Sequence, residues 1–265
     1  MYQNVFFALL ATLGTWLVTA LGAATVVLFR SPKTGVMNLM LGFASGVMIA
    51  ASYWSLLAPA IESAEALGGL PPYVIVTMGF LCGAVFMWMT DKAVNHVRYS
   101  AEPRNTKTEG RNRTLMLILA ITLHNIPEGL AVGVAFGMLG EGDTREALMG
   151  AITIAVGIGL QNFPEGAAVA LPLLREGYTK RRSFLAGQAS GMVEPLAGIL
   201  GAALVVCVRT CLPFLLSFAA GAMILVAVHE LIPECQKDRE TQPYLATVGI
   251  VSGFATMMLL DVALG

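Results

Sequence analysis

The residues best suited to chemistry form a short polar motif inside an apolar stretch. Residues 124–129 read His-Asn-Ile-Pro-Glu-Gly, so an imidazole, a carboxamide and a carboxylate interrupt an otherwise apolar segment. On a helix, His124 and Glu128 are four residues apart and Asn125 and Glu128 are three apart, so all three side chains project from one face. Imidazole, amide oxygen and carboxylate are suitable ligands for a divalent cation such as zinc, iron or manganese.

The motif returns 37 residues later, and a third carboxylate follows it. Residues 161–166 read Gln-Asn-Phe-Pro-Glu-Gly, which puts Gln161, Asn162 and Glu165 on one face of a second helix. Glu194 again precedes a proline, in the run Met-Val-Glu-Pro. Three carboxylates in an apolar setting repel one another or take up protons unless a cation lies among them. The sequence therefore predicts a metal site formed by His124, Asn125, Glu128, Asn162, Glu165 and Glu194.

Five further residues are candidates for the path of the ion, and each also has an ordinary explanation. Gln161 can ligate the ion or hydrogen-bond across the helix pair, and the sequence supports both roles equally. His229 and Glu230 are expected at a helix end, where they would form an exit site or face water. Asp91 is expected at the inner end of the third helix, with the same two explanations. Met48 is far more often a packing residue than a soft contact.

The composition indicates the setting in which these residues must be held. The chain has 265 residues, of which 56% are hydrophobic and only 12% charged, and its mean hydropathy is +0.73. An ordinary soluble domain has about 25% charged residues. The sequence therefore predicts an integral membrane protein, in which a buried glutamate is by default a functional residue with a partner.

Eight segments are long enough to cross the hydrocarbon, which takes about 20 apolar residues. Their pattern lacks the alternation of a membrane barrel, so we expect helices. The expected fold is an all-α membrane protein with eight transmembrane helices, an inverted repeat and a metal site at mid-membrane on helices 4, 5 and 6. It forms a single transporter domain over residues 1–265, with a polar loop at 95–113. The expected helices cover residues 4–29, 36–60, 72–94, 114–138, 147–172, 184–207, 212–233 and 242–264.

The basic residues predict the orientation, because cytoplasmic loops collect Lys and Arg. Fourteen of the 16 fall in the connections after the first, third, fifth and seventh helices, and only Arg145 and Arg209 fall on the other side. We therefore expect both termini outside the cell, the loop 95–113 in the cytoplasm, and the cell membrane as the location.

At these three motifs the sequence resembles the ZIP family of divalent metal transporters, and more narrowly its GufA-like branch. The resemblance covers essentially all eight segments. It implies that His124, Asn125, Glu128, Asn162, Glu165 and Glu194 form a mononuclear or binuclear metal site at mid-membrane. It also implies transport toward the cytoplasm by one helix bundle sliding against another, and a homodimer, because dimers are frequent among relatives.

Two positions depart from the family pattern. Many members have His at the position of Gln161, and some have Asp at that of Asn162, whereas this chain has neutral amides at both. The departure lowers the negative charge of the site. It leaves open whether one or two ions bind and how strongly zinc is preferred.

The expected function is secondary transport of divalent metal by alternating access, with zinc as the first choice and manganese, iron and cadmium as further substrates. We expect no enzymatic activity, no cofactor beyond the transported Zn²⁺, and no nucleic-acid partner; the partners are metal ions and the lipid bilayer. Two alternatives remain. An intramembrane metal-dependent hydrolase would use the same metal to activate water, but the chain has no HExxH. An ion-coupled carrier of an organic solute would need a roomier, more aromatic site.

Overall fold

The structure is a computed structural model that describes residues 2–28, 34–68, 70–100, 122–123, 125–139, 145–175, 177–207, 209–236 and 244–264. Within these ranges every regular element is helical. Seven helical stretches of the described residues are long and apolar enough to cross a membrane. The fourth expected helix, 114–138, lies partly outside the described residues, and its residues 125–137 are helical. The predicted class, an all-α multi-pass membrane protein, is confirmed.

The seven stretches are built from the following elements. They are α1 (Tyr2–Ala23) with η1 (Ala24–Val27); α2 (Thr34–Ala51), η2 (Ser52–Leu57) and α3 (Ala58–Leu67); α4 (Pro72–Ser100); α6 (Arg145–Arg175); α7 (Lys180–Ser190) and α8 (Val193–Cys207); α9 (Leu212–Val226), η4 (Ala227–Leu231) and α10 (Ile232–Cys235), preceded by the short turn η3 (Arg209–Cys211); and α11 (Leu245–Leu264).

Three local features differ from uniform helices. The sixth expected helix is discontinuous, because α7 ends at Ser190 and α8 begins at Val193. The second and seventh each contain a π-helical turn, η2 and η4, a feature frequently found at functional sites. Finally, α4 continues to Ser100, so the first residues of the expected loop 95–113 extend the helix beyond the apolar span, which ends at Ala93.

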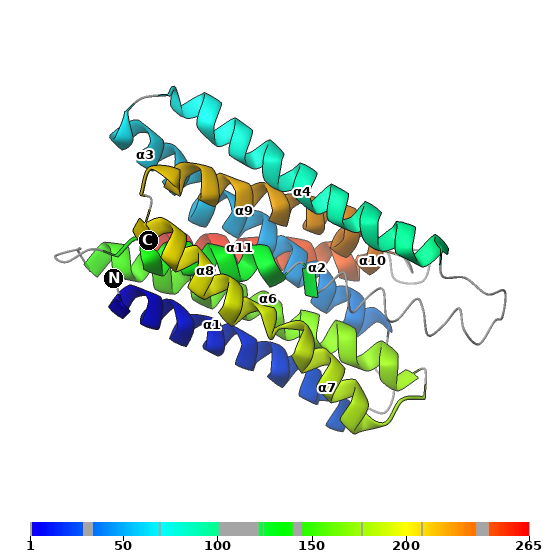
Figure 1. The fold of residues 1–265 in the computed structure, drawn as a ribbon. Helices are drawn as coiled ribbons and strands as arrows, with labels where there is room; N and C mark the ends of the chain where they lie inside the picture. Colours follow the sequence, from blue (N-terminus) through cyan, green and yellow to red (C-terminus); the bar gives the residue numbers. More distant parts are fainter. Residues whose placement is uncertain are drawn as a thin grey trace.

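The helices pack as two groups (Figure 1). In the first bundle, α1 contacts α6, α7 and α8, and the helix 125–137 packs on α8. In the second bundle, α2 lies along α11 and α4 lies along α9. The two bundles meet where α6 contacts α2 and α11. Both chain termini lie at the same end of the molecule (Figure 1).

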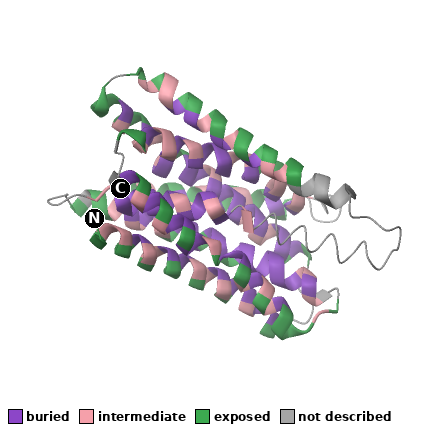
Figure 2. Ribbon diagram, in the orientation of Figure 1, coloured by how far each residue is buried: buried purple, intermediate pink, exposed green. Residues whose placement is uncertain are grey.

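Small residues allow the helices to approach closely, which is how membrane helices associate where lipid gives no hydrophobic drive. A Cβ at Gly46 of α2 would overlap the backbone carbonyl of Ile250 in α11. A Cβ at Gly133 would likewise overlap the backbone of Gly198 in α8. The buried residues follow these contacts along the inner helix faces (Figure 2).

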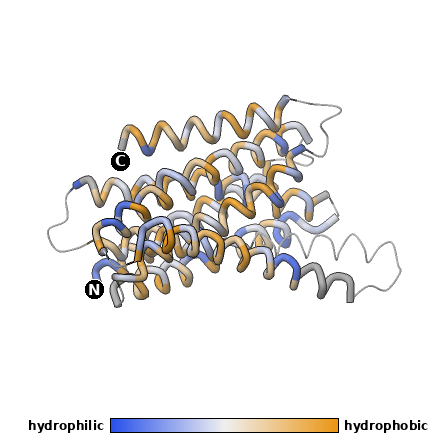
Figure 3. The backbone as a smooth tube through the Cα atoms, turned by 90° about the horizontal axis from the view of Figure 1, so that it is seen from above, coloured by the Kyte–Doolittle hydropathy of each residue, from blue (hydrophilic) through white to orange (hydrophobic). Residues whose placement is uncertain are grey.

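The outward faces of the helices are apolar. Large side chains such as Leu17, Leu81 and Leu259 are more than half exposed in the isolated chain. Hydrophilic residues instead concentrate toward the helix ends (Figure 3). This distribution suits helices surrounded by hydrocarbon, with polar groups at the two interfaces.

Candidate metal centre

Five of the six expected ligands lie buried on three neighbouring elements of the first bundle. Asn125 and Glu128 belong to the helix 125–137, Asn162 and Glu165 to α6, and Glu194 to the first turn of α8. Glu165 is 3% exposed and the other four are 0% exposed. The sixth, His124, lies outside the described residues.

The three carboxylates repel one another. Glu128 experiences Coulombic repulsion from both Glu165 and Glu194, and Glu165 from Glu194. Burying a charge without a partner is costly, since the medium around it cannot replace its hydration. The group of carboxylates therefore needs hydrogen-bond donors, bound protons or a cation.

Gln161 supplies one such donor. Its Nε2 donates a hydrogen bond to Oε1 of Glu128, which joins the helix 125–137 to α6. Gln161 is fully buried, so this bond is made away from solvent. This hydrogen bond is one of the two roles that the sequence allowed for Gln161; its Oε1 has no partner among the described residues, so ligation stays a prediction.

Glu194 is held by three side chains, two of them on the first helix. Nδ2 of Asn162 lies 2.9 Å from Oε1 and 2.9 Å from Oε2 of Glu194. Thr15 Oγ1 donates to Oε2, and Thr19 Oγ1 lies 3.4 Å from Oε1. Both hydroxyls come from α1, which the sequence argument did not connect to the site. The available signal was the 3- and 4-residue spacing of Thr12, Thr15 and Thr19 in an apolar segment, which puts them on one helix face.

The break between α7 and α8 positions Glu194. The chain turns at Gly191, whose carbonyl accepts a hydrogen bond from the Glu194 backbone N–H at 3.0 Å. Pro195 follows in the first turn of α8, where its missing N–H leaves no intrahelical bond unmade. A helix N-terminus also favours a negative charge. Asn125 stabilises the other side of the break, because its Nδ2 donates to the carbonyl of Ser190 at 2.8 Å.

Six buried oxygen atoms of the site have no hydrogen-bond partner among the described residues. They are Oδ1 of Asn125, Oε2 of Glu128, Oε1 of Gln161, Oδ1 of Asn162, and both carboxylate oxygens of Glu165. A buried acceptor without a partner costs free energy comparable to a lost hydrogen bond. Oxygen acceptors of this kind are suitable ligands for a divalent cation.

The carboxylates do not form a cage by themselves. Among the described residues, no three His, Cys, Asp or Glu side chains converge closely enough to hold an ion. The unpartnered oxygens also include amide oxygens, those of Asn125, Gln161 and Asn162.

The remaining candidates lie away from this group. His229 Nε2 is 3.5 Å from Oδ2 of Asp91, a contact between η4 and the end of the apolar span of α4. Glu230 is the next residue of η4 and is half-buried. Met48 is 1% exposed within the core of α2. Its burial agrees with packing, the commoner of its two roles.

Known proteins that are similar to this chain indicate its family. A family model described as ZIP Zinc transporter matches residues 104–261. Human zinc transporter ZIP11 is 38% identical, with 100% of this chain and 99% of the relative covered. Zinc transporter ZIPB of Bordetella bronchiseptica is 37% identical, with 99% and 82% covered, and zinc transporter GufA of Myxococcus xanthus is 33% identical, with 97% and 98% covered. The chain belongs to the ZIP family. The resemblance predicted from its three motifs, including the relation to GufA, is confirmed.

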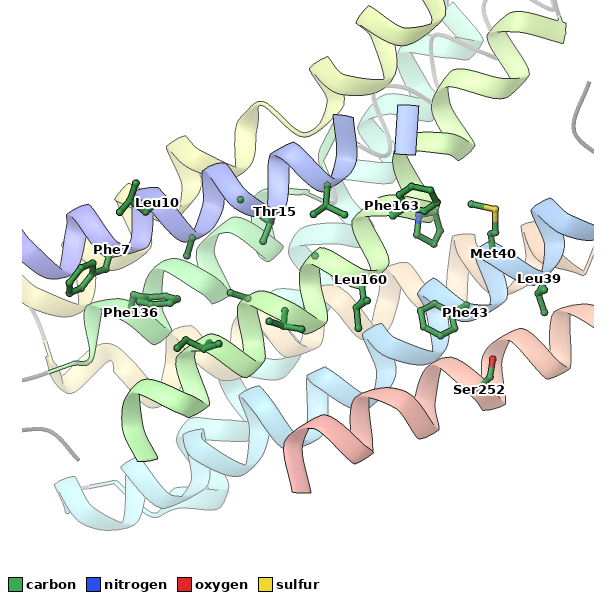
Figure 4. A pocket seen from close by; sticks show the side chains of 18 residues that line it. Phe7, Leu10, Thr15, Leu39, Met40, Phe43, Phe136, Leu160, Phe163 and Ser252 are labelled. Atoms are coloured by element: carbon green, nitrogen blue, oxygen red, sulfur yellow. The ribbon is translucent and has the colours of Figure 1, made fainter. Parts of the chain in front are cut away.

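This ZIP chain also has a large cavity with an apolar lining. It has a volume of about 1080 Å³ and lies where α1 and α6 of the first bundle face α2 and α11 of the second (Figure 4). Its lining includes Leu10, Phe43 and Phe163 and contains no charged residue. The cavity therefore offers an ion no charged ligand. Thr15 lines this cavity as well as contacting Glu194.

Proposed function

We propose that this ZIP chain carries zinc across a membrane by alternating access, with manganese, iron and cadmium as further substrates. The ion is bound at mid-membrane by His124, Asn125, Glu128, Asn162, Glu165 and Glu194. The observation that carries the proposal is the set of six unpartnered buried oxygens, which belong to the two repeated motifs. Relatives that match nearly the whole chain are zinc transporters by name, which supports zinc as the first choice.

The two repeats contribute different ligands. Glu165 has both carboxylate oxygens free and Glu128 has one, so these two residues supply the anionic contacts. The amide oxygens of Asn125 and Asn162 add neutral contacts, and that of Gln161 is a further candidate. Because Asn162 is neutral where some relatives have Asp, the site has a lower negative charge, binds the ion less tightly and releases it more readily.

The two bundles suggest how access alternates. All described ligands belong to the first bundle, whereas the second contributes none of them. Displacing the first bundle against the second would move the whole site together with its ion, without breaking ligand contacts on the way. Such rigid-body motion of one helix bundle against another is a common route to alternating access.

The charge distribution supports the orientation, and the family resemblance implies transport toward the cytoplasm. We assign the side rich in Lys and Arg to the cytoplasm, with both termini outside and the cell membrane as the location. Two charges that move inward through 100 mV gain about 4.6 kcal/mol. The ion then leaves past Asp91, His229 and Glu230, of which the first two are in contact. We also expect a homodimer, on the ground of family resemblance alone.

The two alternatives are less well supported. An organic solute would need a polar cavity of its own size, and the large cavity of the described part is apolar. A hydrolase would need a water-activating metal with an open position and a general base. Known members matching this chain are transporters by name.

The proposal is tested with purified protein in liposomes that contain a metal-sensitive dye. We expect wild type to admit zinc above the level of empty liposomes, and Glu165→Ala to abolish entry. Glu234→Ala is the matched control, because Glu234 lies in α10 at the end of its span. Parallel assays with manganese, iron and cadmium give the preference. If wild type admits no divalent metal, the proposed function is wrong; if the two variants lose the same activity, the site is misplaced.

A further inference from the structure

The apolar cavity between the two bundles has the size and length of a ligand pocket. Its volume of about 1080 Å³ is at the upper end of the roughly 300–1,000 Å³ that such pockets have. The lining recurs on α1 from Phe7 to Val18 and on α6 from Ile152 to Pro164, about 17 Å of helix at 1.5 Å per residue (Figure 4). One leaflet of hydrocarbon is about 15 Å deep, half of the bilayer core. The cavity is therefore long enough for the acyl chain of one lipid.

Water is a poor occupant of this cavity. Of the 18 residues that line it, two have a polar side chain, Thr15 and Ser252. The Ser252 hydroxyl donates to the carbonyl of Gly249 at 2.9 Å, and the Thr15 hydroxyl has acceptors in Glu194 and in the carbonyl of Thr12. A buried water needs two to four polar partners, and these two hydroxyls already donate elsewhere. The lining is suited to hydrocarbon instead.

The cavity is continuous with the surface that faces lipid. Leu10 of α1 is 50% exposed and Val156 of α6 is 42% exposed, and both line the cavity. Thr15 and Phe136 line it as well, but they are only 3% and 7% exposed. The lining thus passes from side chains that meet the surrounding hydrocarbon to side chains that the protein encloses. An acyl chain of the bilayer can enter from the side.

Two glycines keep this space open. Gly14 on α1 and Gly159 on α6 both line the cavity. A Cβ at Gly14 would have no neighbour within 4 Å, and a Cβ at Gly159 would meet only Val18, at 3.9 Å. Other glycines of the same helices serve close packing, since a Cβ at Gly22 or Gly166 would overlap the backbone of the facing helix. Gly14 and Gly159 therefore leave room for something other than the chain itself.

We propose that this cavity binds one acyl chain of a bilayer phospholipid, which enters from the lipid-facing side of α1 and α6. The described lining contains no charged residue, so the headgroup stays outside the cavity. The acyl chain supplies the dispersion contacts that the lining side chains would otherwise lack. A chain that enters from the side can also leave by it. The site is thus compatible with the bundle displacement of the proposed function and does not rest on it.

The test locates the bound chain by photocrosslinking. Purified protein is reconstituted into liposomes of phosphatidylcholine that has a diazirine at the end of one acyl chain, and the labelled residues are identified by mass spectrometry after illumination. We expect wild type to be labelled at Thr15 of the first bundle and Phe43 of the second, both in the cavity lining. Leu17 of α1, which is 59% exposed and does not line the cavity, is the reference for lipid on the outer surface.

Filling the cavity should remove the labelling inside it. For Gly14→Leu/Gly159→Leu, we expect labelling of Thr15 and Phe43, relative to Leu17, to be about 10-fold lower, because the two leucines occupy the space of the chain. Gly150→Leu is the matched control. It lies on α6 outside the cavity, and a Cβ there has no neighbour within 4 Å, so the ratio should equal that of wild type.

Two results would overturn the site: labelling of Leu17 alone in wild type, or the same ratio for the leucine pair as for Gly150→Leu. Should the pair not fold, Gly14→Leu alone adds a side chain where a Cβ meets no neighbour, and it must still lower the ratio below that of Gly150→Leu. Zinc has no part in this measurement. A protein that admits no zinc would disprove the proposed function and leave the labelling result unchanged.

Discussion

The side-chain amide of Gln161 donates a hydrogen bond to Oε1 of Glu128, and this bond joins the two copies of the repeated motif. The donor occupies the first position of the second copy, and the acceptor the fifth position of the first copy. One oxygen of each residue stays without a partner. The bond thus leaves each side chain one oxygen for an ion.

Gln161→Leu should destabilise the protein and weaken zinc binding. It removes a hydrogen bond to a buried charged group, worth about 1.5–3 kcal/mol, and one of the six free oxygens. Thermal unfolding in detergent, with and without zinc, measures both effects. Gln188→Leu in α7, whose amide donates only to the nearby carbonyl of Leu185, should change neither value. Equal losses for the two variants would contradict a role for Gln161 at the site.

Glu165→Gln should make the metal-free protein more stable while removing its response to zinc. Both oxygens of Glu165 are buried without a partner, so neutralising the side chain removes an uncompensated charge, a cost of several kcal/mol. Wild type at 100 times its dissociation constant gains about 2.7 kcal/mol from zinc. The melting temperatures of both proteins, measured across a zinc titration, give the comparison. A zinc-dependent rise in the variant equal to that of wild type would remove Glu165 from the site.

Gly166→Ala should disrupt the packing of α1 on α6. A Cβ at Gly166 would overlap the backbone carbonyl of Thr19, which cannot move without shifting the helix. Overpacking of this kind costs about 1–3 kcal/mol or more. Gly150→Ala is the control on the same helix, because a Cβ there has no neighbour within 4 Å. Yield of folded protein and zinc entry should fall for Gly166→Ala alone, and normal transport by that variant would show that the close approach of α1 is not needed.

Gly159→Leu should slow transport without changing zinc affinity. Gly159 lines the apolar cavity between the two bundles, and a Cβ there would meet only Val18, at 3.9 Å. A leucine therefore fits, but it fills space shared by the two parts that must move. We expect a zinc entry rate about 10-fold lower, equivalent to about 1.4 kcal/mol on the barrier. Gly150→Leu, outside the cavity, is the control. An unchanged rate would mean that the bundles do not close on this cavity.

Much of the fold could be predicted from the sequence, because a membrane helix needs a long apolar run and the chain has several. The expected spans agree with the described ones to within a few residues at most ends. The break at Gly191 was not predicted, since glycine and proline are common in continuous membrane helices as well. The π-helical turns η2 and η4 also have no periodic signal that distinguishes them from an α-helix.

By itself the sequence determined the family, the helical class and the residue types that can bind an ion, since polar groups stand out where nearly everything else is apolar. Only the tertiary structure decided which groups pair. Asn162 and Glu194 are 32 residues apart, and Thr15 and Glu194 are 179 apart, so nothing local connects them. The reason is physical: every buried donor and acceptor must find a partner, and the packing of α1, α6 and α8 determines which one is within reach.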